Sequence, residues 1–165
     1  MRERLQRIRL MASDVDGVLT DGGMYYTDDG DAMKRFNTRD GMGVARLRAI
    51  GVPTVLITSE DSDIVRSRAR KLGIEHCHVG VVDKAALLPA LCQEFDVTSE
   101  EIAYIGDDIN DLGLLRLVGL SAAPADAEPA VRAVATYVCR RRGGAGAFRE
   151  IAELIVEESS RAARS

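Results

Sequence analysis

The sequence predicts an α/β fold with a doubly wound, Rossmann-like parallel sheet, on three observations. Short apolar runs rich in Val, Ile and Leu alternate with longer stretches that have the apolar spacing of helices. The composition is that of an ordinary globular protein, with 46% hydrophobic and 29% charged residues. The chain has 165 residues, the usual size of one domain. We therefore expect a single domain over residues 1–165.

Six apolar runs are predicted strands because each is short, aliphatic and bounded by polar residues or glycine. They cover residues 10–15, 54–58, 76–79, 102–105, 120–122 and 137–139. The predicted helices cover residues 41–50, 62–72, 84–95, 110–118, 128–135 and 148–157. Gly51, Gly73 and Gly119 follow three of these helices, where glycine commonly ends a helix. The strict alternation predicts parallel strands joined by helical crossovers.

The segment 22–36 interrupts this alternation and is predicted to be an inserted β-hairpin. Its centre, residues 28–30, reads Asp-Asp-Gly, which is a strong hairpin turn signal. A two-stranded ribbon is marginally stable alone in water, and this one is rich in Tyr, Met and Phe. We therefore expect the hairpin to pair with other copies of the chain. The alternative is that it folds back onto its own domain.

The overall charge and the lengths of the apolar runs argue against nucleic acid and membranes as partners. Lys and Arg number 22 against 26 Asp and Glu, so no global positive field is present to hold nucleic acid. No apolar run approaches the roughly 18 residues of a membrane span, and Asp14 precedes any possible signal-peptide core. We expect a cytoplasmic protein that binds neither nucleic acid nor a membrane. The basic residues 2–9 are predicted to be a solvated tail.

Polar side chains, most of them carboxylates, follow three of the predicted strands. Asp14 and Asp16 follow the first strand, residues 58–60 the second and residues 106–111 the fourth. Ligands of a doubly wound sheet bind outside the carboxyl ends of its strands, so we expect these residues to meet. Two carboxylates about 4 Å apart repel by about 4 kcal/mol at an effective dielectric constant of about 20, so the cluster requires a cation. Oxygen ligands in an open site suit Mg²⁺.

The motifs at these strand ends resemble those of haloacid dehalogenase superfamily phosphatases. They are DVDGV at residues 14–18, Thr58, Lys84 and GDDIND at residues 106–111, in the order of that superfamily. Further segments are similar to the 3-deoxy-D-manno-octulosonate 8-phosphate phosphatase family, which acts on ulosonate phosphates. These segments are DGGMYY, FNTRDG, GVVDK, VGLSAAPADA and RRGGAGAFREI, and the likeness extends over about residues 8–157.

The resemblance implies hydrolysis of a phosphomonoester in two steps. Asp14 resembles the nucleophile that attacks phosphorus and forms an aspartyl-phosphate. Asp16 resembles the general acid and base that protonates the leaving sugar oxygen and then activates water. Thr58 and Lys84 resemble the residues that hold and neutralise the transferred phosphate group.

The resemblance also implies a Mg²⁺ cofactor. Its ligands would be Asp14, the backbone carbonyl of Asp16, and Asp107. Asp108 and Asp111 are expected to lie behind these ligands, where they orient water, the metal or Lys84.

The substrate implied is a sugar-acid phosphate with eight or nine carbon atoms. The octulosonate enzymes commonly have Thr-Gly-Arg where this chain has Thr58-Ser59-Glu60. Glu60 followed by Lys71 resembles the branch that acts on nonulosonate 9-phosphates of sialic-acid type. We therefore favour the nine-carbon substrate and keep 3-deoxy-D-manno-octulosonate 8-phosphate as the rival. The substrate-binding candidates are Arg39, Ser59, Glu60, Arg68, Lys71 and Arg142, the last in a glycine-rich loop that leads into the final helix, together residues 140–157.

The resemblance implies a homotetramer that takes part in the biosynthesis of lipopolysaccharide or another surface polysaccharide. Too few residues lie between Asp14 and Thr58 for an independent cap domain, so a neighbouring copy is expected to cover the active site. The alternative is a catalytically silent module for assembly, like those fused to sugar-nucleotide synthetases. The intact set Asp14, Asp16, Lys84 and Asp107 favours the enzyme.

Overall fold

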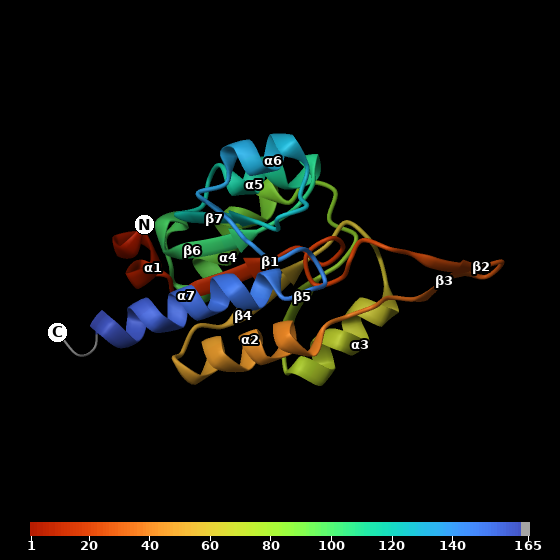
Figure 1. Ribbon diagram of the computed structural model, residues 1–165, viewed down its shortest axis with the longest axis horizontal. Coiled ribbons are helices and arrows are strands. Elements are labelled where there is room, and N and C mark those ends of the chain that lie inside the picture. Colours follow the sequence, from red (N-terminus) through yellow and green to blue (C-terminus); the bar gives the residue numbers. More distant parts are fainter. Residues whose placement is uncertain (163–165) are drawn as a thin grey trace.

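A computed structural model describes residues 1–162, which contain a six-stranded parallel sheet (Figure 1). Its strands are β1 (Leu10–Ser13), β4 (Thr54–Ile57), β5 (His76–His78), β6 (Ile102–Ile105), β7 (Leu120–Ala123) and β8 (Tyr137–Val138). The spatial order is β5-β4-β1-β6-β7-β8, which confirms the predicted doubly wound sheet. The chain passes from β1 to β4 and β5 on one side and then returns to β6 on the other. The strand order therefore reverses at β1, where such sheets bind their ligands.

Helices cover both faces of the sheet. One face carries α1 (Arg2–Arg7), α2 (Thr38–Ala49), α3 (Asp63–Leu72) and α7 (Ala147–Ala162). The other face carries α4 (Leu88–Phe95), α5 (Leu112–Leu115) and α6 (Pro129–Val134). Short 3₁₀ turns at Ala85–Leu87, Ser99–Glu101 and Ile109–Asp111 join these elements. Among residues 1–162, no helix is long and apolar enough to cross a membrane.

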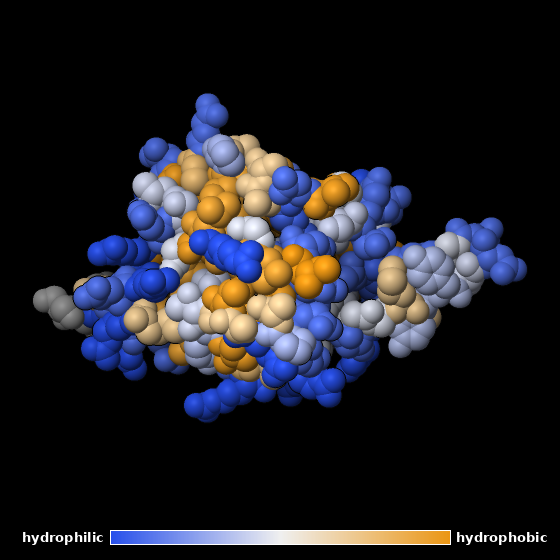
Figure 2. Space-filling view, turned by 90° about the horizontal axis from the view of Figure 1, so that it is seen from above, coloured by the Kyte–Doolittle hydropathy of each residue, from blue (hydrophilic) through white to orange (hydrophobic). Residues whose placement is uncertain are grey.

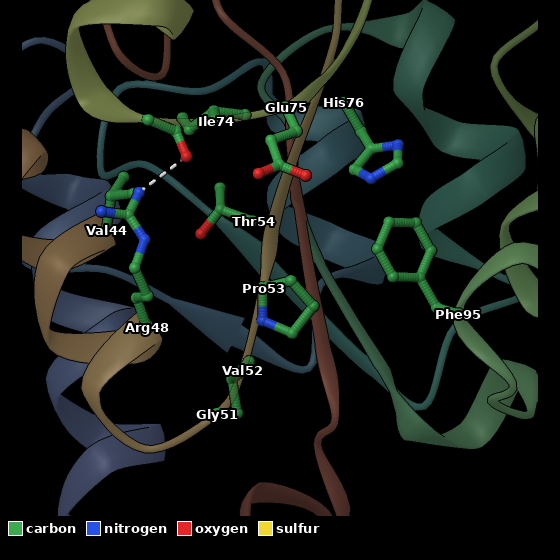
Figure 3. A pocket seen from close by; sticks show the side chains of 11 residues that line it. Val44, Arg48, Gly51, Val52, Pro53, Thr54, Ile74, Glu75, His76 and Phe95 are labelled. Carbon is green, nitrogen blue, oxygen red and sulfur yellow. Dashed lines mark hydrogen bonds between the residues drawn. The ribbon is translucent and has the colours of Figure 1, made fainter.

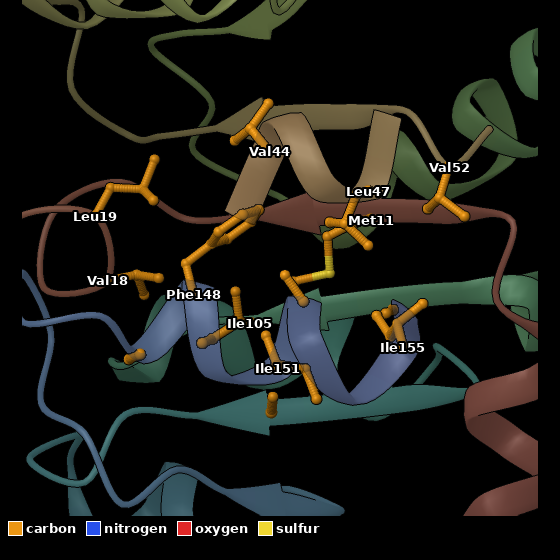
Figure 4. Close-up of a cluster of buried hydrophobic side chains, with 14 of the residues drawn as sticks. Met11, Val18, Leu19, Val44, Leu47, Val52, Ile105, Phe148, Ile151 and Ile155 are labelled. Carbon is orange, nitrogen blue, oxygen red and sulfur yellow. The ribbon is translucent and has the colours of Figure 1, made fainter. Parts of the chain in front are cut away.

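The two cores follow from the alternation of side chains along each strand. Met11 of β1 points into the core on the α2 and α7 side, whereas Leu10 and Ala12 point to the opposite core. Figure 4 shows Phe148 of α7 and Leu47 of α2 packed around Met11. All three are fully buried, and each buried side chain of this size contributes about 1.5–3 kcal/mol. The packed cores make the sheet a rigid frame for the residues at the ends of its strands.

The prediction of a solvated basic tail over residues 2–9 was wrong, because most of this segment forms α1. Leu5 and Ile8 are only 4% and 5% exposed, since they lie three residues apart and both reach the core. The arginines around them bind to the rest of the protein. Arg2 pairs with Glu158 at 3.3 Å, and Arg4 donates to the carbonyl of Gly119 at 2.9 Å.

Several predicted helix limits differ from those observed. Helix α2 begins at Thr38 rather than at residue 41, because the Asn37 side chain accepts a hydrogen bond from Arg39 N at 2.9 Å and caps the helix there. The predicted helix 84–95 begins as a 3₁₀ turn, and α4 itself starts only at Leu88, with a proline at its first positions. Helix α7 continues to Ala162, five residues beyond the predicted end.

The predicted hairpin is present as β2 (Tyr25–Thr27) and β3 (Gly30–Met33), which pair antiparallel. It projects from the body of the protein rather than folding back onto it (Figures 1 and 2). Tyr26 and Met33 are 62% and 60% exposed, and Met24 and Tyr25 are also exposed. Such apolar exposure on a narrow ribbon is typical of a surface that binds another protein. The pairing of hairpins between copies stays a prediction.

Candidate active site

The predicted polar residues meet at the carboxyl ends of three adjacent strands. Ser13 of β1 is in register with both Leu56 of β4 and Ile105 of β6, so the residues that follow emerge at the same level. They surround a cavity of about 220 Å³. Its lining residues are Asp14, Asp16, Gly17, Gly22, Thr58, Ser59, Glu60, Asp107, Asp108 and Asn110.

A fully buried lysine connects the carboxylates at the base of this cavity. Lys84 Nζ lies 2.9 Å from Asp14 Oδ1 and 2.6 Å from Asp111 Oδ1. Burial lowers the pKa of Lys84, but the attraction of the two carboxylates outweighs it and raises the pKa above its usual value. Lys84 is therefore a fixed positive charge beside Asp14.

Asp111 aligns the loop that follows β6. Its Oδ1 accepts hydrogen bonds from Lys84 and from the Tyr104 hydroxyl, the latter at 2.5 Å. Its Oδ2 accepts the backbone N–H groups of Asp107 and Asp108 at 2.8 and 3.2 Å. Both oxygens of Asp111 are therefore engaged, one by the Lys84 ammonium and the other by the backbone N–H groups of Asp107 and Asp108. Asp108 is exposed at the rim, where it accepts the Ile109 N–H at 2.6 Å.

The remaining carboxylate atoms fit a hard divalent cation. One oxygen each of Asp14, Asp107 and Asp111 lie within 4.8 Å of one another. Asp107 Oδ1 and Asp16 Oδ2 are buried and have no hydrogen-bond partner. Burial and the nearby charge of Asp111 raise the pKa of Asp107 to about 7 and that of Asp14 well above its usual value. Both oxygens of Asp111 already accept hydrogen bonds, whereas Asp107 retains a buried oxygen without a partner that could bind a cation.

Gly17 gives a test of this metal site because it lies against Asp107. It has φ of +83°, and a Cβ atom added to it would lie 2.0 Å from Asp107 Oδ2. We expect Gly17→Ala to displace the Asp107 carboxylate and to weaken Mg²⁺ binding at least about tenfold, measured by isothermal titration calorimetry. Gly51→Ala is the matched control, with φ of +78° and open space around the added Cβ. Equal Mg²⁺ affinities in the two variants would contradict the assignment.

Thr58 and Asp16 place further groups around the cavity. Thr58 is buried, and its Oγ1 accepts the Glu60 N–H at 3.2 Å, which leaves the hydroxyl proton for a ligand oxygen. Asp16 Oδ1 lies 2.9 Å from the ammonium of Lys34, and the Thr20 hydroxyl is 3.5 Å from the same oxygen.

Of the predicted substrate-binding residues, Ser59 and Glu60 line the cavity, whereas four others do not within one chain. Arg68 lies over the ring of Phe36 at 5.3 Å and donates to the Asn37 carbonyl. Lys71 is exposed on α3. Arg39 lines a separate basic hollow with Arg140, Arg141 and Arg149, and Arg142 pairs with Asp126 at 3.0 Å. Arg142 is thus held by Asp126 and does not line the cavity of its own chain.

A further hollow, of about 380 Å³, lies at the opposite, amino-terminal end of β4 and β5 (Figure 3). Val44, Thr54, Glu75, His76 and Phe95 are among its lining residues. No residue predicted to act in catalysis or binding lines it.

Among the residues absent from the sequence-based prediction are Tyr104, which donates to Asp111, and Lys34, which pairs with Asp16. Tyr104 occupies an apolar strand position, where a core role was the natural interpretation. Lys34 belongs to the predicted hairpin, but it is one of only three lysines among 22 basic residues. That scarcity was the available signal.

Comparison with known proteins shows the family to which this chain is similar. A model of the haloacid dehalogenase-like hydrolases matches residues 57–151. The 3-deoxy-D-manno-octulosonate 8-phosphate phosphatase KdsC of Yersinia pestis is 40% identical over 154 residues, 93% of this chain and 82% of that protein. The enzyme of the same name from Haemophilus influenzae is 38% identical over 95% of this chain and 87% of its own length.

Solved structures of similar proteins have the same fold. The phosphatase from Moraxella catarrhalis, in complex with magnesium, phosphate and a KDO molecule, has a TM-score of 0.93 at 36% identity, covering 96% of this chain and 91% of that one. The cobalt-bound phosphatase from Haemophilus influenzae has a TM-score of 0.93 at 38% identity, covering 95% and 92%. The chain therefore belongs to the haloacid dehalogenase-like hydrolases, and within them to the family of the 3-deoxy-D-manno-octulosonate 8-phosphate phosphatases.

Proposed function

We propose that this chain is a magnesium-dependent phosphatase that hydrolyses the phosphomonoester of a 3-deoxy-2-ulosonate sugar acid through an aspartyl-phosphate. One observation carries the proposal. Asp14 lies at the end of β1 with Lys84 at 2.9 Å, facing a cavity that also holds Thr58 and the unpartnered oxygen of Asp107. This set provides a nucleophile, a fixed cation, a hydroxyl donor and a metal ligand around one space.

In the first step, a carboxylate oxygen of Asp14 forms a bond to phosphorus and the bond from phosphorus to the sugar oxygen breaks. Asp16 gives its proton to that oxygen, so the sugar leaves as a neutral alcohol. In the second step, Asp16 takes a proton from water, whose oxygen attacks phosphorus and releases Asp14 and inorganic phosphate. Thr58 and Lys84 hold the phosphoryl oxygens throughout.

Mg²⁺ held by Asp14, the Asp16 carbonyl and Asp107 would neutralise the charge of the phosphate and keep both carboxylates ionised. The raised pKa values of Asp14 and Asp107 support a cation here, because burial and mutual repulsion otherwise disfavour their ionised forms.

The relatives favour the eight-carbon substrate, 3-deoxy-D-manno-octulosonate 8-phosphate, over the nonulosonate that Glu60 suggests. Both relatives described above have that activity in their names. The nine-carbon substrate remains the second candidate because Glu60 lines the cavity, where a carboxylate can accept hydrogen bonds from sugar hydroxyls. Within the described chain, Lys71 forms no ion pair with Glu60. Its predicted role therefore requires a neighbouring copy.

A homotetramer supports the same function, because the cavity is open and the exposed hairpin stands beside it. A neighbouring chain would cover the substrate and exclude water. Light scattering on the purified protein tests the assembly.

A panel of phosphate esters with and without Mg²⁺ tests the function. The panel contains octulosonate 8-phosphate, a nonulosonate 9-phosphate and p-nitrophenyl phosphate. We expect hydrolysis that requires Mg²⁺, with kcat/KM for the octulosonate at least about tenfold above that for the nonulosonate. A preference for the nonulosonate would support the prediction, made from Glu60, of a nine-carbon substrate. Absence of hydrolysis of every ester would favour the silent assembly module.

A further inference from the structure

Lys34, directly after β3, is the one residue of the hairpin segment whose charged side chain is fully buried. Its side chain has 0% exposure, and its Nζ lies 2.9 Å from Asp16 Oδ1 and 3.5 Å from Asp31 Oδ2. The residues on either side behave differently. Met33 is 60% exposed, and Arg35 forms an exposed ion pair with Asp21 at 2.9 Å.

Burial of an ammonium group costs several kcal/mol unless carboxylates compensate for it. Here two carboxylates do so, one inside the hairpin segment and one outside it. Asp31 is at the start of the return strand, and Asp16 is in the loop after β1. Both carboxylates lie within ion-pair distance of the Lys34 ammonium and compensate its charge where it is buried. The row Asp31, Lys34, Asp16 is thus a fixed chain of charges that links the hairpin to the active site.

The two carboxylate oxygens of Asp16 have different surroundings. Oδ1 faces Lys34 at 2.9 Å and the Thr20 hydroxyl at 3.5 Å. Oδ2 is buried and has no hydrogen-bond partner, although Asp16 lines the cavity. An unpartnered buried oxygen is costly, and it persists when the groups around it fix its orientation. Lys34 is the closest of those groups.

We propose that Lys34 is a positioning residue for the acid and base step. It holds Oδ1 of Asp16 so that Oδ2 stays directed at the leaving oxygen and then at the attacking water. The inference rests on the proposed function of Asp16. The inference also gives the hairpin segment a part in catalysis, separate from any part in pairing between copies of the chain.

The proposal makes different predictions for different leaving groups. A sugar alkoxide needs a proton as it leaves, whereas p-nitrophenolate is a stable anion and leaves without one. The ratio kcat/KM reports only the steps up to release of the alcohol or phenol, so hydrolysis of the phosphoenzyme does not affect it. Loss of Lys34 should therefore affect the sugar phosphate far more than the aryl phosphate.

The experiment compares Lys34→Met with the wild type on octulosonate 8-phosphate and on p-nitrophenyl phosphate, at saturating Mg²⁺. We expect kcat/KM to fall about 100-fold for the sugar phosphate and less than about fivefold for the aryl phosphate. We also expect a burst of p-nitrophenolate, because Asp16 activates water poorly in the variant and the phosphoenzyme accumulates. Lys34→Arg, which keeps the cation, should recover most of the activity toward the sugar phosphate.

Arg35→Met is the matched control, since it removes a neighbouring cation whose partner, Asp21, is outside the cavity. Arg35→Met should leave kcat/KM unchanged for both the sugar phosphate and the aryl phosphate. In an Asp16→Asn background, adding Lys34→Met should change kcat/KM by less than about twofold, because Lys34 acts through Asp16.

The proposal would be overturned if Lys34→Met lowered kcat/KM equally for both esters, as misfolding would. It would also be overturned if kcat/KM for both esters were unchanged. An inactive wild type would instead reject the proposed function itself.

Discussion

Replacement of Asp14 by Asn is expected to lower kcat for phosphate esters by at least about 10⁴-fold while the protein stays folded. The amide has the shape of the carboxylate and can still accept the Val15 N–H, which lies 2.7 Å from Oδ1. It lacks the negative oxygen that the proposed mechanism requires for attack on phosphorus. Burial raises the pKa of Asp14, so its charge destabilises the folded state at neutral pH. Neutralising it should leave the thermal midpoint unchanged or higher.

Asp63→Asn is the matched control, because Asp63 carries the same functional group on α3 with a side chain that is 96% exposed. It should have wild-type activity. Rapid quenching with labelled substrate should trap an acid-stable phosphoenzyme in the control and none in Asp14→Asn. Retention of more than a few per cent of the wild-type rate by Asp14→Asn would reject the nucleophile and, with it, the covalent mechanism.

The main sheet and its acidic site were predictable because both depend on local patterns. Each strand is a short aliphatic run, and the parallel topology then brings Asp14, Thr58 and Asp107 to one edge. The resemblance to the family, whose motifs occur in the same order, then suggested a role for each of these residues. Comparison with known proteins confirms that family.

The contacts that the sequence did not predict depend on tertiary packing. Leu5 and Ile8 look like isolated apolar residues in a basic segment, and only the core between α1 and α7 explains their burial. Lys34 follows a strand on which side chains point alternately to two faces, and no pattern shows which face meets Asp16. The roles predicted for Lys71 and Arg142 depend on contacts between copies.

The glycine-rich loop illustrates a signal with two interpretations. Its residue Arg142 was predicted to bind the substrate. In the structure, a Cβ added to Gly143 would lie 1.8 Å from the Gly17 carbonyl oxygen. The Gly143 N–H donates to Asp126 at 2.9 Å. At this position, glycine therefore allows the loop to pack closely against the backbone beside Asp16.

Lys84→Met is expected to reduce the free energy of unfolding by about 3–5 kcal/mol at pH 8, in addition to abolishing activity. The variant leaves the carboxylates of Asp14 and Asp111 buried without their cation, and these side chains are only 7% and 0% exposed. Urea denaturation measures the change. Lys71→Met, on the exposed surface of α3, is the control and should change stability by less than about 0.5 kcal/mol.

The pH dependence separates this electrostatic loss from a simple packing defect. Lys84 lowers the pKa of Asp14, so its removal raises further a value that burial has already raised. A carboxyl group whose pKa is raised in the folded state destabilises the protein fully when the pH is above this raised pKa. The destabilisation decreases as the pH falls and is gone below the pKa that the group has in the unfolded chain. The difference between Lys84→Met and the wild type should therefore shrink from pH 8 to pH 5. A difference independent of pH would indicate a cavity instead.

A second substitution tests the same cause at fixed pH. Asp14→Asn removes one of the two uncompensated charges, so the double variant with Lys84→Met should be more stable than Lys84→Met alone by at least about 1 kcal/mol. Mg²⁺ should also restore part of the stability of Lys84→Met, because a cation bound at Asp14 and Asp107 replaces the missing positive charge. Restoration by Mg²⁺ in Lys84→Met, and its absence in the double variant, would show that the lysine and the metal compensate the same aspartate.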